Sequence, residues 1–292
     1  MEAIKLTGFA AAVPETKVLM KQLPFPSNKH KDQFTRQVGI TEKRFSNNLL
    51  TAGDLCFSAA QKMLHELSWD ASSVSVLVLV TQSPDQQMPA TAIRLQEKLG
   101  LPRSCLAFDI NLGCSGWVYG LSVISSLLQT LGIRRGLVLA GETSVLTSED
   151  DLGYFPLMGD AGTATALELS SDAEPMHFQF YYDGSRFKAI YAPNSGTRHF
   201  ANGGAETDLK YRAQMDAGQV LRFCLLDVVP NLRSFMKKHA ANIENMDHFV
   251  FHQANRLINE SMQQKLSIPE KKNPTQSANS ATPPLLPYRL PS

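Results

Sequence analysis

One stretch, residues 106–131, places an apolar run, a tight turn and an apolar helix in direct succession. The run LAFDI carries an aromatic and a β-branched residue, which is typical of a buried strand. After the turn NLG, apolar side chains recur at helical spacing from Trp117 to Leu128. A buried strand that leads into an apolar helix is typical of a sheet with helices packed on its faces. The stretch therefore favours an α/β fold.

Continuous apolar runs and amphipathic patterns predict further elements of the same two kinds. They are strands at 3–12, 74–81, 136–142 and 163–169, and helices at 51–66 and 91–99. Because strands and helices alternate up to about residue 170, we expect a mostly parallel sheet with helices on its faces. The polar, basic segment 17–48 is either an ordered loop over a site or a solvated excursion.

A second unit begins near residue 176. Its apolar runs and helical patterns predict strands at 178–183 and 248–251, a long helix at 214–241 interrupted at Pro230, and a helix at 256–266. In each unit a helix leads through a polar link to an apolar strand, and a chemically reactive residue follows that strand. We therefore divide the chain into an N-terminal half, 1–170, and a C-terminal half, 171–292.

The composition narrows the class of protein and its compartment. The 292 residues carry 28 Lys and Arg against 27 Asp and Glu, so no basic face for nucleic acid is expected. The four cysteines are widely scattered and form no CxxC pair, which argues against disulfides and a metal site and favours a reducing compartment. The N-terminus resembles no signal peptide, and no apolar run is long enough to span a bilayer. We expect a cytoplasmic protein that binds no membrane.

Cys114 stands at the junction between the buried strand and the helix. The free N–H groups and the positive dipole end of a helix start stabilise a thiolate. Gly113 and Gly116 lower the steric cost of a sharp turn and leave room beside the sulfur for a substrate. The alternative is a small buried side chain that only packs, and this stretch by itself leaves both interpretations open.

His252 follows the predicted strand 248–251 in the motif HQAN. Ligands in open parallel sheets bind beyond the carboxyl ends of the strands, so two facing units bring this imidazole close to the thiol of Cys114. We expect the other three cysteines, Cys56, Cys105 and Cys224, to serve packing only.

Four motifs carry a resemblance to a known family. They are FDINLGCSGWVYGL around Cys114, FVFHQANRLI around His252, and the weaker MGDAGTATAL and RQVGITEKRF. In this order and spacing the chain, from residue 3 to about 272, resembles the β-ketoacyl-acyl-carrier-protein synthase III family of the thiolase superfamily. The resemblance implies a homodimer of duplicated βαβ halves, packed as a five-layered α-β-α-β-α sandwich that needs no cofactor.

The resemblance also implies an acyltransferase of fatty-acid or specialised-metabolite synthesis. Cys114 takes the acyl group from a thioester on acyl-carrier protein or coenzyme A, and a malonyl thioester then loses carbon dioxide and condenses with it. His252 stabilises the oxygen of the malonyl thioester. Asn255 contacts the pantetheine arm, and Met88 reaches into the acyl pocket of the partner subunit. The Asp160 turn shapes the pocket without a chemical role.

The chain departs from the family in the region that binds coenzyme A. Family members that use coenzyme A hold its adenine end with a tryptophan and two arginines. Here the stretch DQFTRQVGI has no tryptophan, Arg36 is displaced by one residue, and Leu152 replaces the second arginine. Leucine neither stacks on adenine nor pairs with phosphate as a guanidinium does. We therefore expect an acyl donor bound to carrier protein, rather than acetyl-coenzyme A.

The C-terminal residues depart from the family as well. The asparagine that accompanies the histidine is best matched by Asn279, although the preceding glycine is absent. A final strand pair of the family supplies an oxyanion donor, and the proline-rich tail PPLLPYRLP is not suited to central strands. We therefore expect truncated C-terminal strands and a weakened oxyanion site.

Two other functions are compatible with these residues. The acyl group on Cys114 can pass to an amine or hydroxyl without condensation, with His252 as general base. Alternatively, the chain is a catalytically weak subunit that binds acyl chains or carrier protein.

Overall fold

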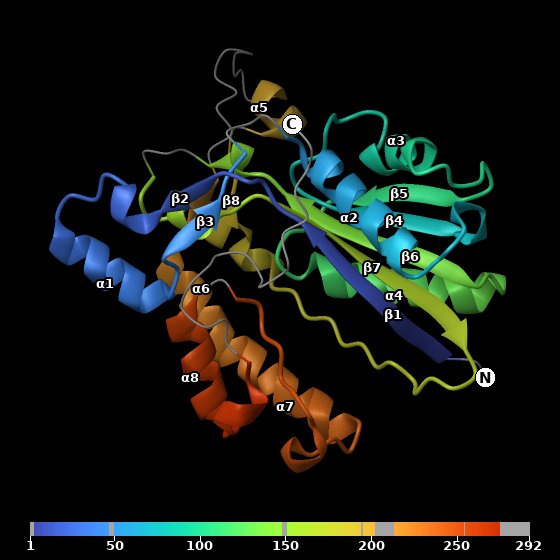
Figure 1. Ribbon diagram of the computed structural model, residues 1–292. Helices are drawn as coiled ribbons and strands as arrows, with labels where there is room; N and C mark the ends of the chain where they lie inside the picture. The colour runs from blue at the N-terminus through green and yellow to red at the C-terminus, as the bar shows by residue number, and fades with distance from the viewer. Residues whose placement is uncertain are drawn as a thin grey trace.

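The computed structural model describes residues 3–46, 50–147, 151–193, 195–201, 213–253 and 255–274. A five-stranded sheet in the order β1-β7-β6-β4-β5 lies at its centre (Figure 1). Its strands are β1 (Ala3–Ala12), β4 (Val76–Val80), β5 (Leu106–Ile110), β6 (Arg135–Glu142) and β7 (Ala161–Ser170). All five lie where the apolar runs predict them, within two residues at either end.

The directions of the strands differ from the prediction. β4 is parallel to β5 and β6, whereas β7 is antiparallel to both of its neighbours, β6 and β1. The prediction of a mostly parallel sheet is therefore wrong at β7, and the sheet is mixed. The described part of the β6–β7 connection contains the 3-10 turns Ser144–Leu146 and Phe155–Leu157, in place of a crossover helix. Without a crossover helix, the chain returns to the sheet at the same end at which β6 finishes. β7 therefore runs in the opposite direction to β6.

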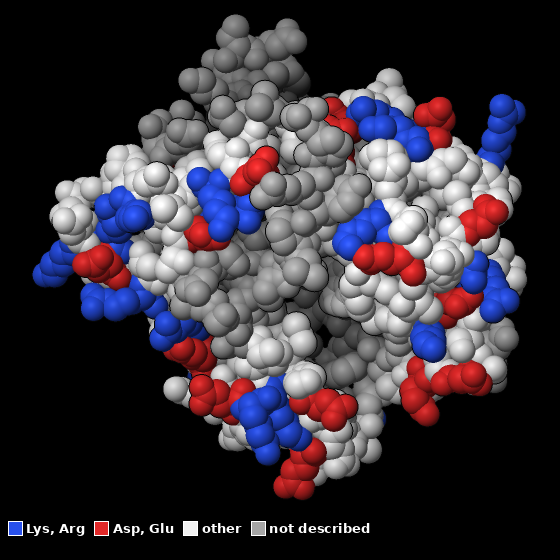
Figure 2. Space-filling model, viewed as in Figure 1, with Lys and Arg blue, Asp and Glu red and all other residues white. Residues whose placement is uncertain are grey.

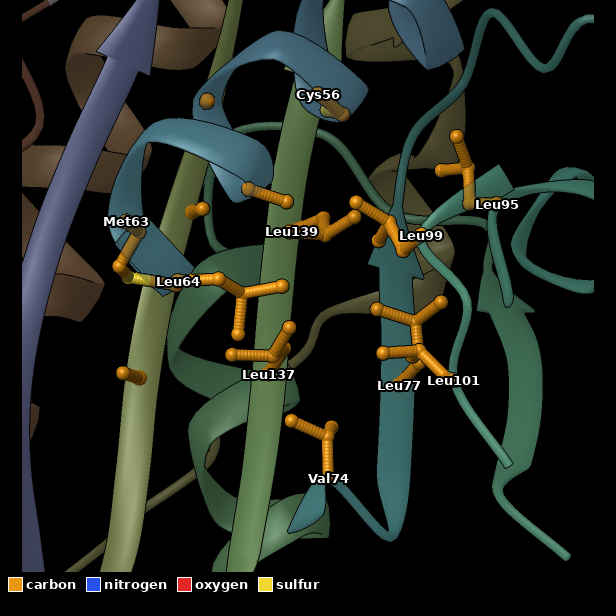
Figure 3. Close-up of a cluster of buried hydrophobic side chains, with 14 of the residues drawn as sticks. Cys56, Met63, Leu64, Val74, Leu77, Leu95, Leu99, Leu101, Leu137 and Leu139 are labelled. Atoms are coloured by element: carbon orange, nitrogen blue, oxygen red, sulfur yellow. The ribbon is translucent and has the colours of Figure 1, made fainter. Parts of the chain in front are cut away.

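Helices cover both faces of this sheet. The helices α2 (Ala52–Glu66) and α3 (Thr91–Lys98) pack on one face, and α4 (Gly116–Leu131) packs on the other. The sequence of β4 is apolar throughout because helices cover both of its faces. Leu77 and Leu79 face α2 and α3, while its valines face α4. Figure 3 shows the cluster beneath α2 and α3 with Leu77 labelled. Leu77 and Leu79 are both fully buried.

Local sequence fixes where two of these helices begin. Thr51 caps α2, because its hydroxyl accepts from the backbone N–H of Asp54 and the Asp54 carboxylate accepts from that of Thr51. α4 begins at Gly116, where an added Cβ would lie 2.3 Å from a methyl carbon of Val80. A glycine is needed there because the start of α4 lies directly against the end of β4.

The basic segment 17–46 forms an ordered unit. It contains an antiparallel pair of strands, β2 (Lys17–Leu19) and β3 (Glu42–Arg44), with helix α1 (Asn28–Val38) between them, rather than the predicted loop. Its apolar side chains pack with Phe155 in a separate small core. Lys43 is fully buried, and its ammonium donates to the carbonyl oxygen of Phe155 at 2.8 Å. This segment is therefore anchored to the β6–β7 connection.

The described C-terminal elements are mainly helical. They are β8 (Ile190–Tyr191), α5 (Gly196–Ala201), β9 (Gln214–Met215), α6 (Ala217–Phe223), a π-helical turn (Cys224–Val228), α7 (Val229–Lys238) and α8 (Arg256–Leu266). The long helix predicted at 214–241 is thus divided at the π-helical turn. The π-helical turn directly precedes Pro230, and the backbone at Val228 and Val229 stays helical, so the helical stretch continues through the proline rather than ending there.

The strands predicted at 178–183 and 248–251 are absent from the structure. Neither segment pairs with a strand among the described residues, where β8 and β9 form the largest sheet of this half. A strand needs a hydrogen-bonding neighbour, and an apolar pattern alone does not supply one. Val250 is accordingly 78% exposed, although Phe178 packs against the α4 side of the large sheet.

The large sheet is complete at Ser170, and the division into halves at 170 and 171 stays a prediction. Basic and acidic side chains are interspersed over the face of the molecule in Figure 2. Within the described ranges, every helix is too short or too polar to cross a bilayer.

Candidate active site

Three parallel strands end at the same edge of the large sheet. β4 leads into Gln82 and Ser83, β5 leads into the turn that carries Cys114, and β6 ends at Glu142. Because the carboxyl ends of these three strands lie side by side, the residues that follow them gather at one edge of the sheet.

The turn 111–115 presents Cys114 between the strand β5 and the helix α4. The N–H of Gly116 donates to the carbonyl oxygen of Gly113 at 2.8 Å and closes this turn. Cys114 is exposed, so its sulfur is accessible to a reagent in solution. Surrounding protein atoms nonetheless remove part of its hydration, which by itself raises the pKa of the thiol.

The structure brings Cys114 and His252 together. Their side chains lie close enough to interact, and this interaction is the largest cause of a lowered pKa for the Cys114 thiol and of a raised pKa for the His252 imidazole. Burial opposes both shifts, and attraction between the charged forms reinforces them. The arrangement favours a thiolate beside an imidazolium, which is the reactive form of a cysteine nucleophile. The catalytic roles of both residues stay predictions.

Glu142 and Tyr154 border this pair, and no sequence motif marks either of them as a site residue. Burial raises the pKa of Glu142 to about 7, against the effect of hydrogen bonds from Ser83 and from the N–H of Gln82. Burial is also the main cause that raises the pKa of Tyr154 to about 12, and the charges of Cys114 and Glu142 contribute. The only sequence signal for Glu142 was an acidic residue at the end of the apolar run GLVLAGE.

The other three cysteines differ from Cys114 in the direction of their shifts. Burial raises the pKa of Cys56 far above its usual range, and that of Cys105 to about 11. Burial also raises the pKa of Cys224, and the charge of Cys114 adds to this. Cys224 packs in the apolar cluster of α7 and α8, as predicted, and it also lies close enough to Cys114 to sense its charge. A lowered thiol pKa is therefore confined to Cys114.

The remaining predicted residues occupy different places. Asn255 caps α8, its side-chain oxygen accepting from the N–H of Ile258 at 3.3 Å. Met88, between β4 and α3, is 86% exposed. Asn279 lies outside the described residues. The roles of these three residues toward a substrate stay predictions.

Asp160, just before β7, is a structural residue in this arrangement. Its buried carboxylate accepts four hydrogen bonds of 2.6–2.8 Å, from the N–H and hydroxyl groups of Ser46 and Ser144. These bonds tie the basic segment and both ends of the β6–β7 connection to one point beside the site.

Comparisons with known proteins agree on one family. Residues 108–184 match the family model of 3-oxoacyl-[acyl-carrier-protein] synthase III. A curated β-ketoacyl-[acyl-carrier-protein] synthase III from Streptococcus equi subsp. zooepidemicus (strain MGCS10565) is 27% identical over 269 residues, which are 92% of this chain and 82% of that protein.

Solved structures give the same result across nearly the whole chain. The crystal structure of a 3-oxoacyl-(acyl-carrier protein) synthase from Burkholderia xenovorans LB400 superposes with a TM-score of 0.87 at 30% identity. The match covers 95% of this chain and 81% of that one. A second 3-oxoacyl-(acyl-carrier-protein) synthase III gives a TM-score of 0.88 at 28% identity, with 95% and 86% covered. The predicted thiolase-like fold is thereby confirmed, and the chain belongs to the 3-oxoacyl-[acyl-carrier-protein] synthase III family.

Proposed function

We propose that this protein is a condensing acyltransferase that accepts an acyl group on Cys114 and joins it to a malonyl thioester. The observation that carries this proposal is the close approach of the Cys114 and His252 side chains, which lowers the pKa of the thiol and raises that of the imidazole. Family membership supports the reaction class. The products serve fatty-acid or specialised-metabolite synthesis.

In the first half-reaction, the thiolate of Cys114 attacks the carbonyl carbon of an acyl thioester. The bond from that carbon to the carrier sulfur breaks, and the leaving thiolate takes the proton of the His252 imidazolium. The start of α4 follows Cys114 directly, and its N–H groups favour negative charge at this turn.

In the second half-reaction, a malonyl thioester loses carbon dioxide. The resulting carbanion attacks the acyl carbonyl carbon on Cys114, and the sulfur leaves as thiolate. Negative charge develops on the malonyl thioester oxygen, and a hydrogen-bond donor at His252 stabilises it. Asn279 is our candidate for the second donor, and Asn255 for a contact with the pantetheine arm.

The acyl donor is a carrier-protein thioester in this proposal. Leu152 packs in the apolar cluster with Phe45 and Phe155, so an uncharged side chain occupies the position expected for an adenine-binding arginine. Arg36 lies exposed on α1 and supplies a single guanidinium. A single guanidinium, without the tryptophan and the second arginine of the family, binds the adenine end of coenzyme A more weakly.

We further infer a homodimer located in the cytoplasm. β5 is an edge strand of the large sheet and offers its free side to a second copy. Met88 projects an unusually exposed apolar side chain, which fits a residue that completes the partner's acyl pocket. All four cysteines are free thiols, which supports a reducing compartment.

Mass spectrometry of the intact protein tests the first half-reaction. We expect an acyl adduct after mixing with acyl-carrier-protein thioesters, loss of the adduct in Cys114→Ala, and its retention in the matched control Cys105→Ala. Efficient acylation by acetyl-coenzyme A would contradict the carrier-protein donor. An unmodified wild type would favour a binding subunit instead.

Malonyl-carrier protein, added to the acylated enzyme, tests the second half-reaction. We expect release of carbon dioxide together with a 3-oxoacyl thioester. Transfer of the acyl group to an added amine or alcohol, without carbon dioxide, would replace condensation by simple acyl transfer.

A further inference from the structure

Glu142 ends β6 and connects two of the three strand ends at the site. One carboxylate oxygen accepts the N–H of Gln82 at 2.5 Å, and the other accepts the hydroxyl of Ser83 at 2.7 Å. The Ser83 oxygen in turn accepts the N–H of Thr143 at 3.0 Å. These three bonds lock the turn after β4 to the end of β6.

The same turn supports the residue beside the nucleophile. An added Cβ at Gly113 would lie 2.4 Å from the side-chain oxygen of Gln82, so the two residues are in close contact. Gly113 precedes Cys114 and its carbonyl closes the turn by accepting from Gly116. A displacement of Gln82 would therefore be transmitted to the turn that holds the sulfur.

We propose that Glu142 is a positioning residue for Cys114, which fixes the Gln82–Ser83 turn against Gly113 and holds its carboxylate within electrostatic range of the thiol. The proposal deepens the acyltransferase function and rests on it for its biological meaning. Glu142 does not touch the reacting atoms, so its effect passes through Gln82 and through its electric field.

Several titratable groups surround this carboxylate. Cys114 lies on the β5–α4 turn, Tyr154 on the β6–β7 connection and Cys56 on α2, and each senses the charge of Glu142. His252 contacts Cys114 from the segment before α8. An ionised Glu142 disfavours a thiolate at Cys114, because like charges repel, whereas the imidazolium of His252 favours it.

Burial raises the pKa of Glu142 to about 7, so its charge changes within the physiological range. As the pH rises through this value, the new negative charge works against the thiolate. We therefore expect the thiol of Cys114 to ionise over a broader pH range than a single isolated group does.

The experiment follows alkylation of Cys114 by iodoacetamide between pH 5 and pH 10, with peptide mass spectrometry to identify the modified cysteine. In Glu142→Gln we expect the midpoint of the rate profile to move to lower pH, and the rate at pH 7 to rise roughly two- to fivefold. Glu97→Gln, on the exposed side of α3, is the matched control and should leave the profile unchanged.

Ser83→Ala gives a second, independent variant. It retains the carboxylate but removes a hydrogen bond that favours its charged form, so Glu142 keeps its proton to higher pH. We expect its alkylation midpoint to lie between those of wild type and Glu142→Gln. Circular dichroism verifies that each variant is folded, and Ser83→Ala suffices if Glu142→Gln is not.

A change in the charge beside Cys114 moves the midpoint of its alkylation rate against pH. A merely structural change alters only the size of the rate. If folded Glu142→Gln or Ser83→Ala keeps the wild-type midpoint, the proposal is overturned, whatever happens to the size of the rate. Since iodoacetamide needs no acyl donor, this result is independent of the acyltransferase proposal, which fails separately if thioesters leave wild-type Cys114 unmodified.

Discussion

Asp160→Asn should destabilise the protein strongly, although it changes neither size nor shape. Both carboxylate oxygens of Asp160 accept, one from the N–H and hydroxyl of Ser46 and the other from those of Ser144. An amide has one oxygen and one NH2 group, so one of the two backbone N–H groups must face another donor. The serine hydroxyl beside it can rotate and accept, but the backbone N–H cannot.

The magnitude follows from these bonds. One backbone N–H loses its acceptor in a fully buried position, and the remaining bonds lose the strength that a charged acceptor gives them. An unsatisfied buried donor costs about 1–3 kcal/mol, and weaker bonds at the other oxygen raise the total to about 2–4 kcal/mol. For a chain of this size, the melting temperature should fall by roughly 3–7 °C.

Urea unfolding followed by circular dichroism measures the free energy of unfolding directly. Asp172→Asn is the matched control, because Asp172 is exposed in the turn after β7, and it should change the free energy of unfolding by less than about 0.5 kcal/mol. A loss below about 1 kcal/mol for Asp160→Asn would show that the four bonds are not individually required, and would refute the reasoning.

Four further predictions concern the site and the core. His252→Ala removes the main cause that lowers the pKa of the Cys114 thiol, so alkylation by iodoacetamide at pH 7 should slow about tenfold or more; an unchanged rate contradicts the pair. Because the folded-state pKa of Glu142 is raised to about 7 from 4.5, its contribution to stability is present below pH 4.5 and is lost as the pH rises to 7. The urea midpoint of unfolding should therefore fall less between pH 4.5 and pH 7 in Glu142→Gln than in wild type. An equal fall in both proteins contradicts the raised pKa of Glu142. Leu77→Ala should cost about 2–5 kcal/mol in urea unfolding, since its side chain is fully buried under α2 and α3. Met88→Ala should leave stability within about 0.5 kcal/mol but change the preferred acyl chain in a competition of carrier-protein thioesters, and an unchanged preference argues against a role at the pocket.

Elements with strong local signals could be predicted from the sequence. β5 and α8 have their predicted bounds, and α4 contains the predicted helical run from Trp117 to Leu128, because an apolar period, a cap or a glycine specifies each within a few residues. The proximity of Cys114 and His252 was also predictable, since each residue follows an apolar run and such runs end at ligand sites in α/β folds.

Features that depend on distant partners could not be predicted in this way. The direction of β7 depends on the connection before it, which the apolar run itself does not reveal. The segments 178–183 and 248–251 have strand-like patterns, but a ladder also needs a neighbouring strand. Glu142 was missed because its importance arises from hydrogen bonds with Gln82 and Ser83, about sixty residues earlier in the chain.

The two carboxylates beside the site differ in how completely they are hydrogen-bonded, and this difference gives them different tasks. Asp160 accepts from two backbone N–H groups and two hydroxyls, so it fixes two loops at one buried point. Glu142 is half-buried with fewer donors, and burial outweighs them in setting its pKa near 7. One carboxylate therefore holds the loops in place, while the charge of the other acts on the thiol of Cys114.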